Sequence, residues 1–141
     1  MRGRLCQKVA KGLLGGAMQA DRPHPVSYAL TVARACAEFA LEAMNQRSFP
    51  KPYASALSVA AEDAATRLGE FLSAQGETIA PDALKTASLA RTDLEAVAQI
   101  TMLIIANDLA PKAASFVARS VRYTAEHAVN RLSHVEEAIG A

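Results

Sequence analysis

The sequence predicts an all-α protein, and three observations lead to this fold class. Hydrophobic residues make up 51% of the chain, aromatic residues only 5%, and alanine supplies much of the apolar fraction. Such a composition favours close-packed helices over strands. No stretch shows sustained strand-type alternation bounded by turn signals. Proline-containing breakers separate long segments with helical periodicity. At 141 residues we expect one domain: a helical bundle of four main helices, one short helix and an N-terminal helical arm.

The first segment, residues 1–22, is a basic N-terminal arm that precedes the bundle domain of residues 23–141. Its cations are Arg2, Arg4, Lys8 and Lys11, and residues 1–20 contain no acid. A weak apolar stripe predicts a loosely docked helix. The segment matches a signal peptide poorly, because Lys11 interrupts its apolar part. We expect a cytoplasmic protein, with attachment to a membrane surface or export as the alternatives.

The second helix is predicted over residues 26–46, after the breaker at residues 22–25. Its polar side chains form one narrow stripe, within which Arg34 and Glu38 have the spacing of a helical ion pair. Cys36 lies on the apolar side, and with Cys6 it is expected to be a free thiol in a reducing compartment. A narrow stripe means that either other helices or another subunit cover this helix. The stripe comprises Ser27, Thr31, Arg34, Glu38, Glu42 and Asn45.

The third helix is predicted over residues 53–74, after a second proline-containing breaker at residues 48–52. Apolar residues from Tyr53 to Phe71 form its core stripe, and its opposite face is polar. A short helix over residues 82–90 follows, with Pro81 near its first position.

The central helix, residues 93–106, is the one segment that is apolar on nearly every side. A helix of this kind is either buried or spans a membrane, and a span needs ~20 apolar residues. We therefore expect a core helix that the others cover. Thr92 with Glu95 three residues later predicts a capping box and hence a break before this helix. Pro111 marks its end.

The last helix is predicted over residues 112–138 and has an unusual flank between its core line and its polar face. Aromatic, basic and histidine side chains lie together there, which is typical of protein interfaces and also of nucleic-acid surfaces. A solvated face near a helix C-terminus, where positive charge is favoured, is the third interpretation. The candidate binding residues are Phe116, Arg119, Tyr123, His127, Asn130 and His134.

Arg122 and His127 in this helix have an Arg-x4-His spacing that resembles the motif of HEPN-type ribonucleases, which are small all-α proteins. The resemblance covers six residues. It implies that His127 acts as a general acid or base on a ribose hydroxyl and that Arg122 stabilises charge on the phosphate. Five residues place the two side chains ~140° apart on a straight helix, so they would converge only through the reach of Arg122 or across a dimer.

Other chemistry is not indicated by the sequence. The Glu-x-x-His motifs of di-metal bundles are missing, and His127 and His134 are ~10 Å apart along a helix, too far to share one ion. There is no phosphate-binding glycine loop and no nucleophile elbow. We therefore expect no metal and no cofactor, although a small-ligand pocket between helices stays open.

The leading hypothesis is a non-enzymatic adaptor or regulatory module that binds another protein chain, as a homodimer. The reason is excess apolar helix surface, since exposed apolar patches mark interaction sites. The alternative is a small RNA-binding protein or ribonuclease that uses the basic flank of the last helix.

Overall fold

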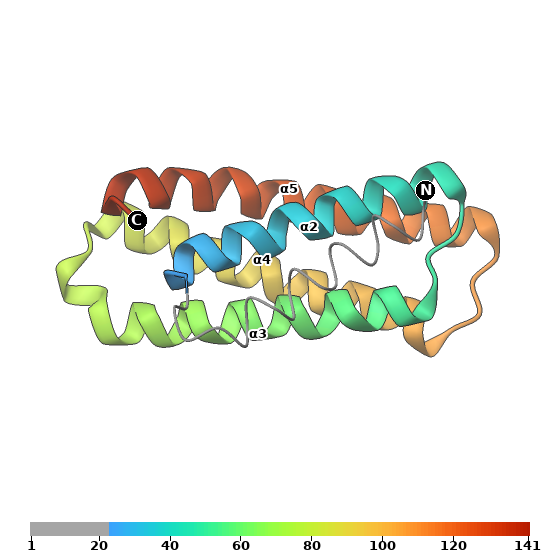
Figure 1. The fold of residues 1–141 in the computed structure, drawn as a ribbon, viewed down its shortest axis with the longest axis horizontal. Helices are drawn as coiled ribbons and strands as arrows, with labels where there is room; N and C mark the ends of the chain where they lie inside the picture. Colours follow the sequence, from blue (N-terminus) through green and yellow to red (C-terminus); the bar gives the residue numbers. More distant parts are fainter. Residues whose placement is uncertain (1–22) are drawn as a thin grey trace.

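Four long helices, each with a proline in its first turn, form most of the structure, which is a computed structural model that describes residues 23–141 (Figure 1). They are α2 (Pro25–Gln46), α3 (Lys51–Gln75), α4 (Pro81–Ala106) and α5 (Pro111–Ile139), and a short 3₁₀ helix, η1 (Gly76–Thr78), follows α3. The predicted all-α bundle of four main helices is confirmed. The arm of residues 1–22 lies outside the described residues.

The helix starts follow from the positions of the prolines. Pro25, Pro52, Pro81 and Pro111 each occupy the first or second helical position, where the missing N–H costs nothing and the fixed φ suits a helix. At the start of α2 the cap is His24, whose Nδ1 accepts a hydrogen bond from the Val26 amide at 3.1 Å. The breakers seen in the sequence therefore set the bounds of the elements.

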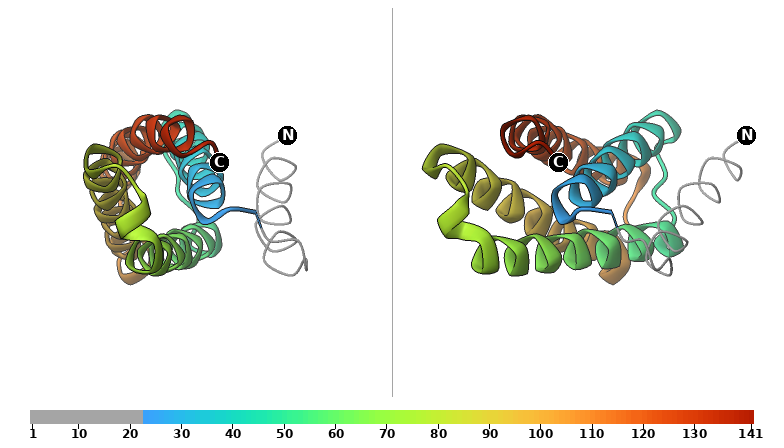
Figure 2. Two further views of the ribbon diagram at one scale, coloured as in Figure 1. Left: turned by 90° about the vertical axis from the view of Figure 1, so that its left-hand side faces the viewer. Right: turned by 60° about the vertical axis from the view of Figure 1, so that its left-hand side comes forward.

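The four helices form a ring when the bundle is viewed along its axis (Figure 2). Successive helices run in opposite directions, and α2 and α5 close the ring (Figures 1 and 2). The main contacts join α2 to α5 and α3, and α4 to α3 and α5. Two connections, between α2 and α3 and between α4 and α5, therefore lie at one end of the bundle, and η1 lies at the other.

The core consists of a few leucines and valines surrounded by many alanines. Leu57, Leu68, Leu94 and Leu132 are among the largest fully buried side chains. Small side chains let the helices approach closely, so a short chain buries a long line of contacts. The fully buried alanines include Ala33, Ala40, Ala61, Ala64, Ala87, Ala90, Ala118, Ala125 and Ala128.

Helix α2 is covered by this chain itself. Its apolar side, from Val26 to Ala43, is buried against its neighbours α3 and α5. Cys36 is fully buried and is a free thiol, as predicted. The narrow polar stripe of this helix therefore needs no second subunit to explain it.

Helix α4 corrects two expectations. The break predicted at Thr92 is absent, because residues 81–106 are one continuous helix. The Thr92 hydroxyl donates to the Ser88 carbonyl oxygen at 3.2 Å, and Glu95 pairs with Arg91 at 3.1 Å. Both groups are thus satisfied within the helix and no cap forms.

The second correction concerns burial of the central segment. Leu94, Val97 and Ile104 are buried, but Met102 and Leu103 are 48% and 50% exposed. A four-helix ring covers only one side of each member, so apolar residues all round a helix do not become buried all round. The segment is a core helix on one side and an apolar surface on the other.

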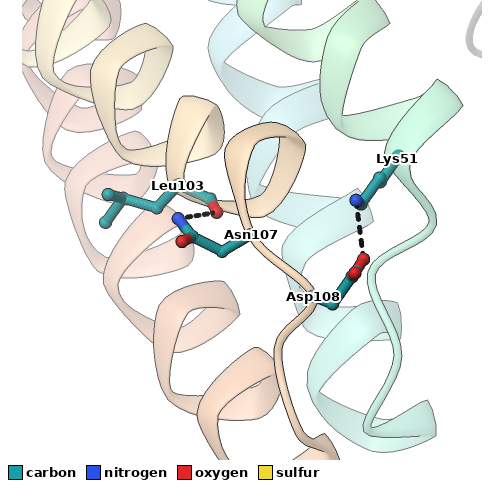
Figure 3. Close-up of polar contacts among 4 residues, drawn as sticks. All are labelled: Lys51, Leu103, Asn107 and Asp108. Carbon is teal, nitrogen blue, oxygen red and sulfur yellow. Dashed lines mark hydrogen bonds and ion pairs between the residues drawn. The ribbon is translucent and has the colours of Figure 1, made fainter.

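Polar contacts between helices are few. Tyr28 of α2 donates to Asp63 of α3 at 2.9 Å, and Arg131 of α5 pairs with Asp93 of α4. At the end of α4, Figure 3 shows Lys51 pairing with Asp108 at 2.7 Å, which joins the start of α3 to the α4–α5 connection. None of the described helices has the length and apolar character that crossing a membrane requires.

Candidate functional site

The predicted flank of the last helix lies on one exposed side of α5. All six residues are exposed, and the two aromatic side chains stand out, with Phe116 67% and Tyr123 66% exposed. We call this set the α5 flank; it comprises Phe116, Arg119, Tyr123, His127, Asn130 and His134. Its members recur at helical spacings on the side opposite the buried line of α5, so the face results directly from the sequence pattern.

Within the α5 flank, Tyr123 and His127 contact each other. Their ring centroids are 4.6 Å apart with the planes tilted by 58°. The contact arises because residues four apart lie one above the other on a helix. It joins two rings into one exposed aromatic surface near the middle of α5.

Helix α4 extends this surface, although the sequence pattern predicted that its central segment would be covered. Leu89 and Leu103 of α4 are 43% and 50% exposed. Asp93, which reaches α5 through Arg131, lies on the side of α4 next to α5. At 100° per residue, Leu89 and Leu103 are about 40° and 80° from Asp93, on the outward side.

On α5, the rotation of 100° per residue places Tyr123 about 80° from Arg131, on the outward side. Because α4 and α5 are antiparallel, Leu103 and Tyr123 then lie at nearly the same level along the bundle. Figure 3 shows the Leu103 side chain pointing away from Lys51 and hence from α3. Together the two helices expose four large apolar side chains, Leu89, Leu103, Phe116 and Tyr123, which we call the apolar face. Leu89 lies about 20 Å from Leu103 along α4.

The basic residues of α5 divide into paired and unpaired groups. Arg122 donates to Glu126 at 2.8 Å, and Arg131 is held by Asp93. Lys112 and Arg119 form no ion pair with any residue in the range 23–141. Only the second group is therefore available to an anionic partner.

Lys112, Phe116 and Arg119 line an open cleft of about 880 Å³, together with Arg47 from the end of α2. We call it the basic cleft, because its lining includes three cations and no acid. Sequence spacing could not have revealed Arg47, since it lies far from α5 in the chain. It reaches the cleft because the chain turns there, with Arg47 in the left-handed conformation at φ 51°.

The structure does not bring Arg122 and His127 together. The guanidinium of Arg122 is bound to Glu126, whereas the ring of His127 packs on Tyr123. The two side chains therefore have separate partners, in keeping with the ~140° between their positions on the helix. A single chain thus lacks the paired arrangement that a ribonuclease of the HEPN type would use.

The polar stripe of α2 does not form a charged cluster. Arg34 and Glu38 are both exposed, and the expected ion pair between them is absent from the pairs found in residues 23–141. Glu42 is partly buried and lines a small pocket of about 60 Å³ between the end of α2 and the start of α3.

The strongest pKa shifts belong to the core and not to the α5 flank. Burial raises the pKa of the Cys36 thiol to about 12. Burial, and then the hydrogen bond to Asp63, raise the pKa of Tyr28 to about 12. Both shifts favour the neutral form, so neither group is prepared for nucleophilic or acid–base chemistry at neutral pH. Among residues 23–141, no three His, Cys, Asp or Glu side chains are grouped so that they could hold a metal ion.

Comparisons with known proteins give no relative for this chain. No protein-family model matches it, and neither the curated proteins nor the solved structures include a significant match. Its function therefore has to be inferred from its own residues.

Proposed function

We propose that the protein is a non-enzymatic helical interaction module that forms a homodimer through the apolar face of α4 and α5. One observation carries the proposal: four large apolar side chains, Leu89, Leu103, Phe116 and Tyr123, are between 43% and 67% exposed on two neighbouring helices. Large apolar side chains left exposed on neighbouring helices favour a contact with another protein, and aromatic side chains are enriched at contact centres.

A second copy of the chain is the partner that this face fits. A two-fold axis brings the same surface from both copies together. If two α5 helices cross antiparallel at Tyr123, the Lys112 ends lie at opposite ends of the interface. The cations of the basic cleft then do not face each other, and the apolar side chains meet at the centre. Because Phe116 belongs to both surfaces, such a dimer covers the Phe116 side of each basic cleft.

The test is the molar mass of the protein in solution, measured by light scattering during size exclusion. We expect the wild-type chain to be dimeric at micromolar concentration. Tyr123→Glu or Leu103→Glu should give a monomer, because each places a charge at the centre of the contact. Val59→Glu is the matched control, since Val59 is 65% exposed on α3, away from this face. A monomeric wild type, or dissociation by the control alone, contradicts the proposal.

RNA binding in the basic cleft is the second candidate, favoured by the three cations around the exposed ring of Phe116. Single-stranded RNA is bound by cations that contact phosphates and by aromatic rings that stack on bases. Binding of a labelled oligonucleotide should then weaken as salt increases and should be reduced in Lys112→Gln and Arg119→Gln. Lys85→Gln on exposed α4 surface is the control. Retained RNA affinity in both cleft variants excludes this candidate.

A further inference from the structure

Phe116 belongs both to the apolar face and to the basic cleft. Its side chain is 67% exposed, and it lines the cleft together with Arg47, Lys112 and Arg119. It is the one side chain of the apolar face that does so. A partner that covers this ring on one surface therefore removes it from the other.

The two cations of α5 in the cleft lie on either side of Phe116. Lys112 precedes it by four residues and Arg119 follows it by three, so the three side chains project from an arc of about 60° and span about 10 Å of the helix. Both cations are exposed, and neither forms an ion pair within residues 23–141. A strand of phosphates that contacts both cations therefore passes over the Phe116 ring.

Single-stranded RNA and a second copy of the chain need this ring in different ways. RNA gains from phosphate contacts with cations and from the stacking of a base on an exposed ring. The dimer instead covers the ring against the apolar face of the partner. Because a ligand shifts an equilibrium toward the state that it binds better, RNA favours the chain with an uncovered ring.

We propose, on the basis of the homodimer, that single-stranded RNA in the basic cleft and dimer formation exclude each other at Phe116. RNA then converts the dimer into monomers. If the exclusion is complete, RNA at about ten times its dissociation constant leaves roughly one chain in eleven free to dimerise, and the apparent dimer dissociation constant rises about 100-fold. By the same linkage, RNA affinity falls as the concentration of the chain rises.

The test uses the full chain and a fluorescently labelled uridine octamer at constant ionic strength. Light scattering over a concentration series gives the dimer dissociation constant, and fluorescence anisotropy gives the RNA affinity. We expect a saturating amount of the octamer to raise the dimer dissociation constant of the wild type at least roughly tenfold. The variant Lys112→Gln with Arg119→Gln should dimerise like the wild type and be insensitive to the octamer, because these cations bind the phosphates and lie beside the apolar contact.

The matched control is Arg34→Gln with Lys85→Gln, since both residues are exposed and the loss of charge is the same. Neither residue lines the cleft, so this variant should respond to the octamer as the wild type does.

The possible results separate the homodimer from its competition with RNA. A wild type that is monomeric without RNA overturns both. A dimer that does not bind the octamer, or that binds it with an unchanged dimer dissociation constant, overturns the competition and leaves the homodimer standing. The competition is also overturned if the octamer dissociates the variant of Lys112 and Arg119 as readily as the wild type.

Discussion

The buried side of α2 and the apolar face of α4 and α5 are both rich in hydrophobic residues, yet the fold treats them differently. The buried side of α2 combines alanines and valines with Tyr28, Leu30 and Phe39, and the chain covers it. The apolar face carries two leucines and two aromatic side chains, with Phe116 and Tyr123 about two-thirds exposed. From the sequence, α2 was expected to be covered by other helices or by another subunit, and the central segment of α4 was expected to be a covered core helix.

The difference lies in position around the ring, because Tyr28, Leu30 and Phe39 of α2 are as large as the side chains of the apolar face and yet are buried. Alanine-rich faces let neighbouring helices approach closely. The inward side of α2 is therefore covered by α3 and α5. The outer side of a helix in a four-membered ring has no neighbour, whatever its residues. Large apolar residues on that outer side therefore indicate a contact with another molecule more reliably than a narrow polar stripe does.

The largest difference in stability between a buried and an exposed apolar substitution is expected for two leucines of α4. Leu94 is fully buried, and Leu103 is 50% exposed. Leu94→Ala should lower the free energy of unfolding by about 2–5 kcal/mol, because it removes apolar contacts and leaves a cavity. Leu103→Ala should change it by less than about 0.5 kcal/mol in dilute, monomeric protein. Urea unfolding measures both, and equal losses would erase the distinction between the two surfaces.

The next effect concerns the buried side of α2 at high pH. The pKa of Cys36 is raised from 9.0 to about 12 by burial, and that of Tyr28 from 10.0 to about 12 by burial and by Asp63. A raised pKa in the folded state means that the unfolded chain ionises first as pH increases. The stability from each group is complete below its unfolded pKa and is lost as pH rises toward 12.

We therefore expect the melting temperature to fall between pH 9 and 12, with each group contributing up to about 1.4 kcal/mol per pH unit. Cys36→Ala should be less stable at neutral pH, because it leaves a small cavity, but its melting temperature should depend less steeply on pH. Tyr28→Phe should remove the second contribution. A pH dependence that is unchanged in both variants would show that neither ionisation is coupled to unfolding.

The fold could be predicted from the sequence because its determinants are local. Pro25, Pro81 and Pro111 fix helix starts through their own φ angles, and helical periodicity identified the buried lines of α3 and α5. The wrong prediction of a helix break at Thr92 also has a local cause. A threonine followed by glutamate three residues later predicts a helix cap, but inside the continuous helix α4 the Thr92 hydroxyl bonds to Ser88 and Glu95 pairs with Arg91, each one turn earlier.

The candidate sites were only partly predictable, because they combine residues from different helices. The α5 flank is one side of one helix and follows from spacing alone. Arg47 in the basic cleft and Leu103 beside Tyr123 depend on which helices become neighbours and in what register. Nothing in the sequence carries that information. The pocket that Glu42 lines with Phe39 and Tyr53 likewise joins residues of α2 and α3, so spacing within one helix could not predict it.

A smaller change in stability is expected for Gly69→Ala, which tests how closely α3 and α4 approach each other at a small residue. A Cβ atom at Gly69 would lie 2.6 Å from the Arg91 guanidinium carbon, which is the flexible end of a side chain and can move. Gly69→Ala should gain about 0.5–1 kcal/mol of helix stability and lose most of the exposed Arg91–Glu95 pair, worth about 0.3–0.5 kcal/mol. A net change between zero and a slight stabilisation is expected in thermal unfolding.

The double variant Gly69→Ala with Arg91→Ala sharpens this test. Without the Arg91 guanidinium the new methyl group at residue 69 has no clash. The double variant should therefore be more stable than Arg91→Ala alone by the full helix preference of alanine over glycine. A strong destabilisation by Gly69→Ala in both backgrounds would mean that the backbone, and not the arginine side chain, limits how closely α3 and α4 approach.

The smallest change in stability is expected on breaking the ion pair between Lys51 and Asp108, which is exposed like the apolar face but consists of polar side chains. The hydrogen bond from Lys51, and then its charge, lower the pKa of Asp108. A lowered pKa means that the pair stabilises the fold above the unfolded pKa of the carboxyl and that this contribution disappears as pH falls. Because the Asp108 side chain is 96% exposed, solvent screens the pair and Asp108→Asn should lower the melting temperature only slightly at neutral pH. The wild-type and variant curves should converge in acid, and Lys51→Gln should add no further loss to Asp108→Asn. A loss comparable to that of Leu94→Ala would mean that the connections at this end, and not the alanine-rich core, hold the four helices in register.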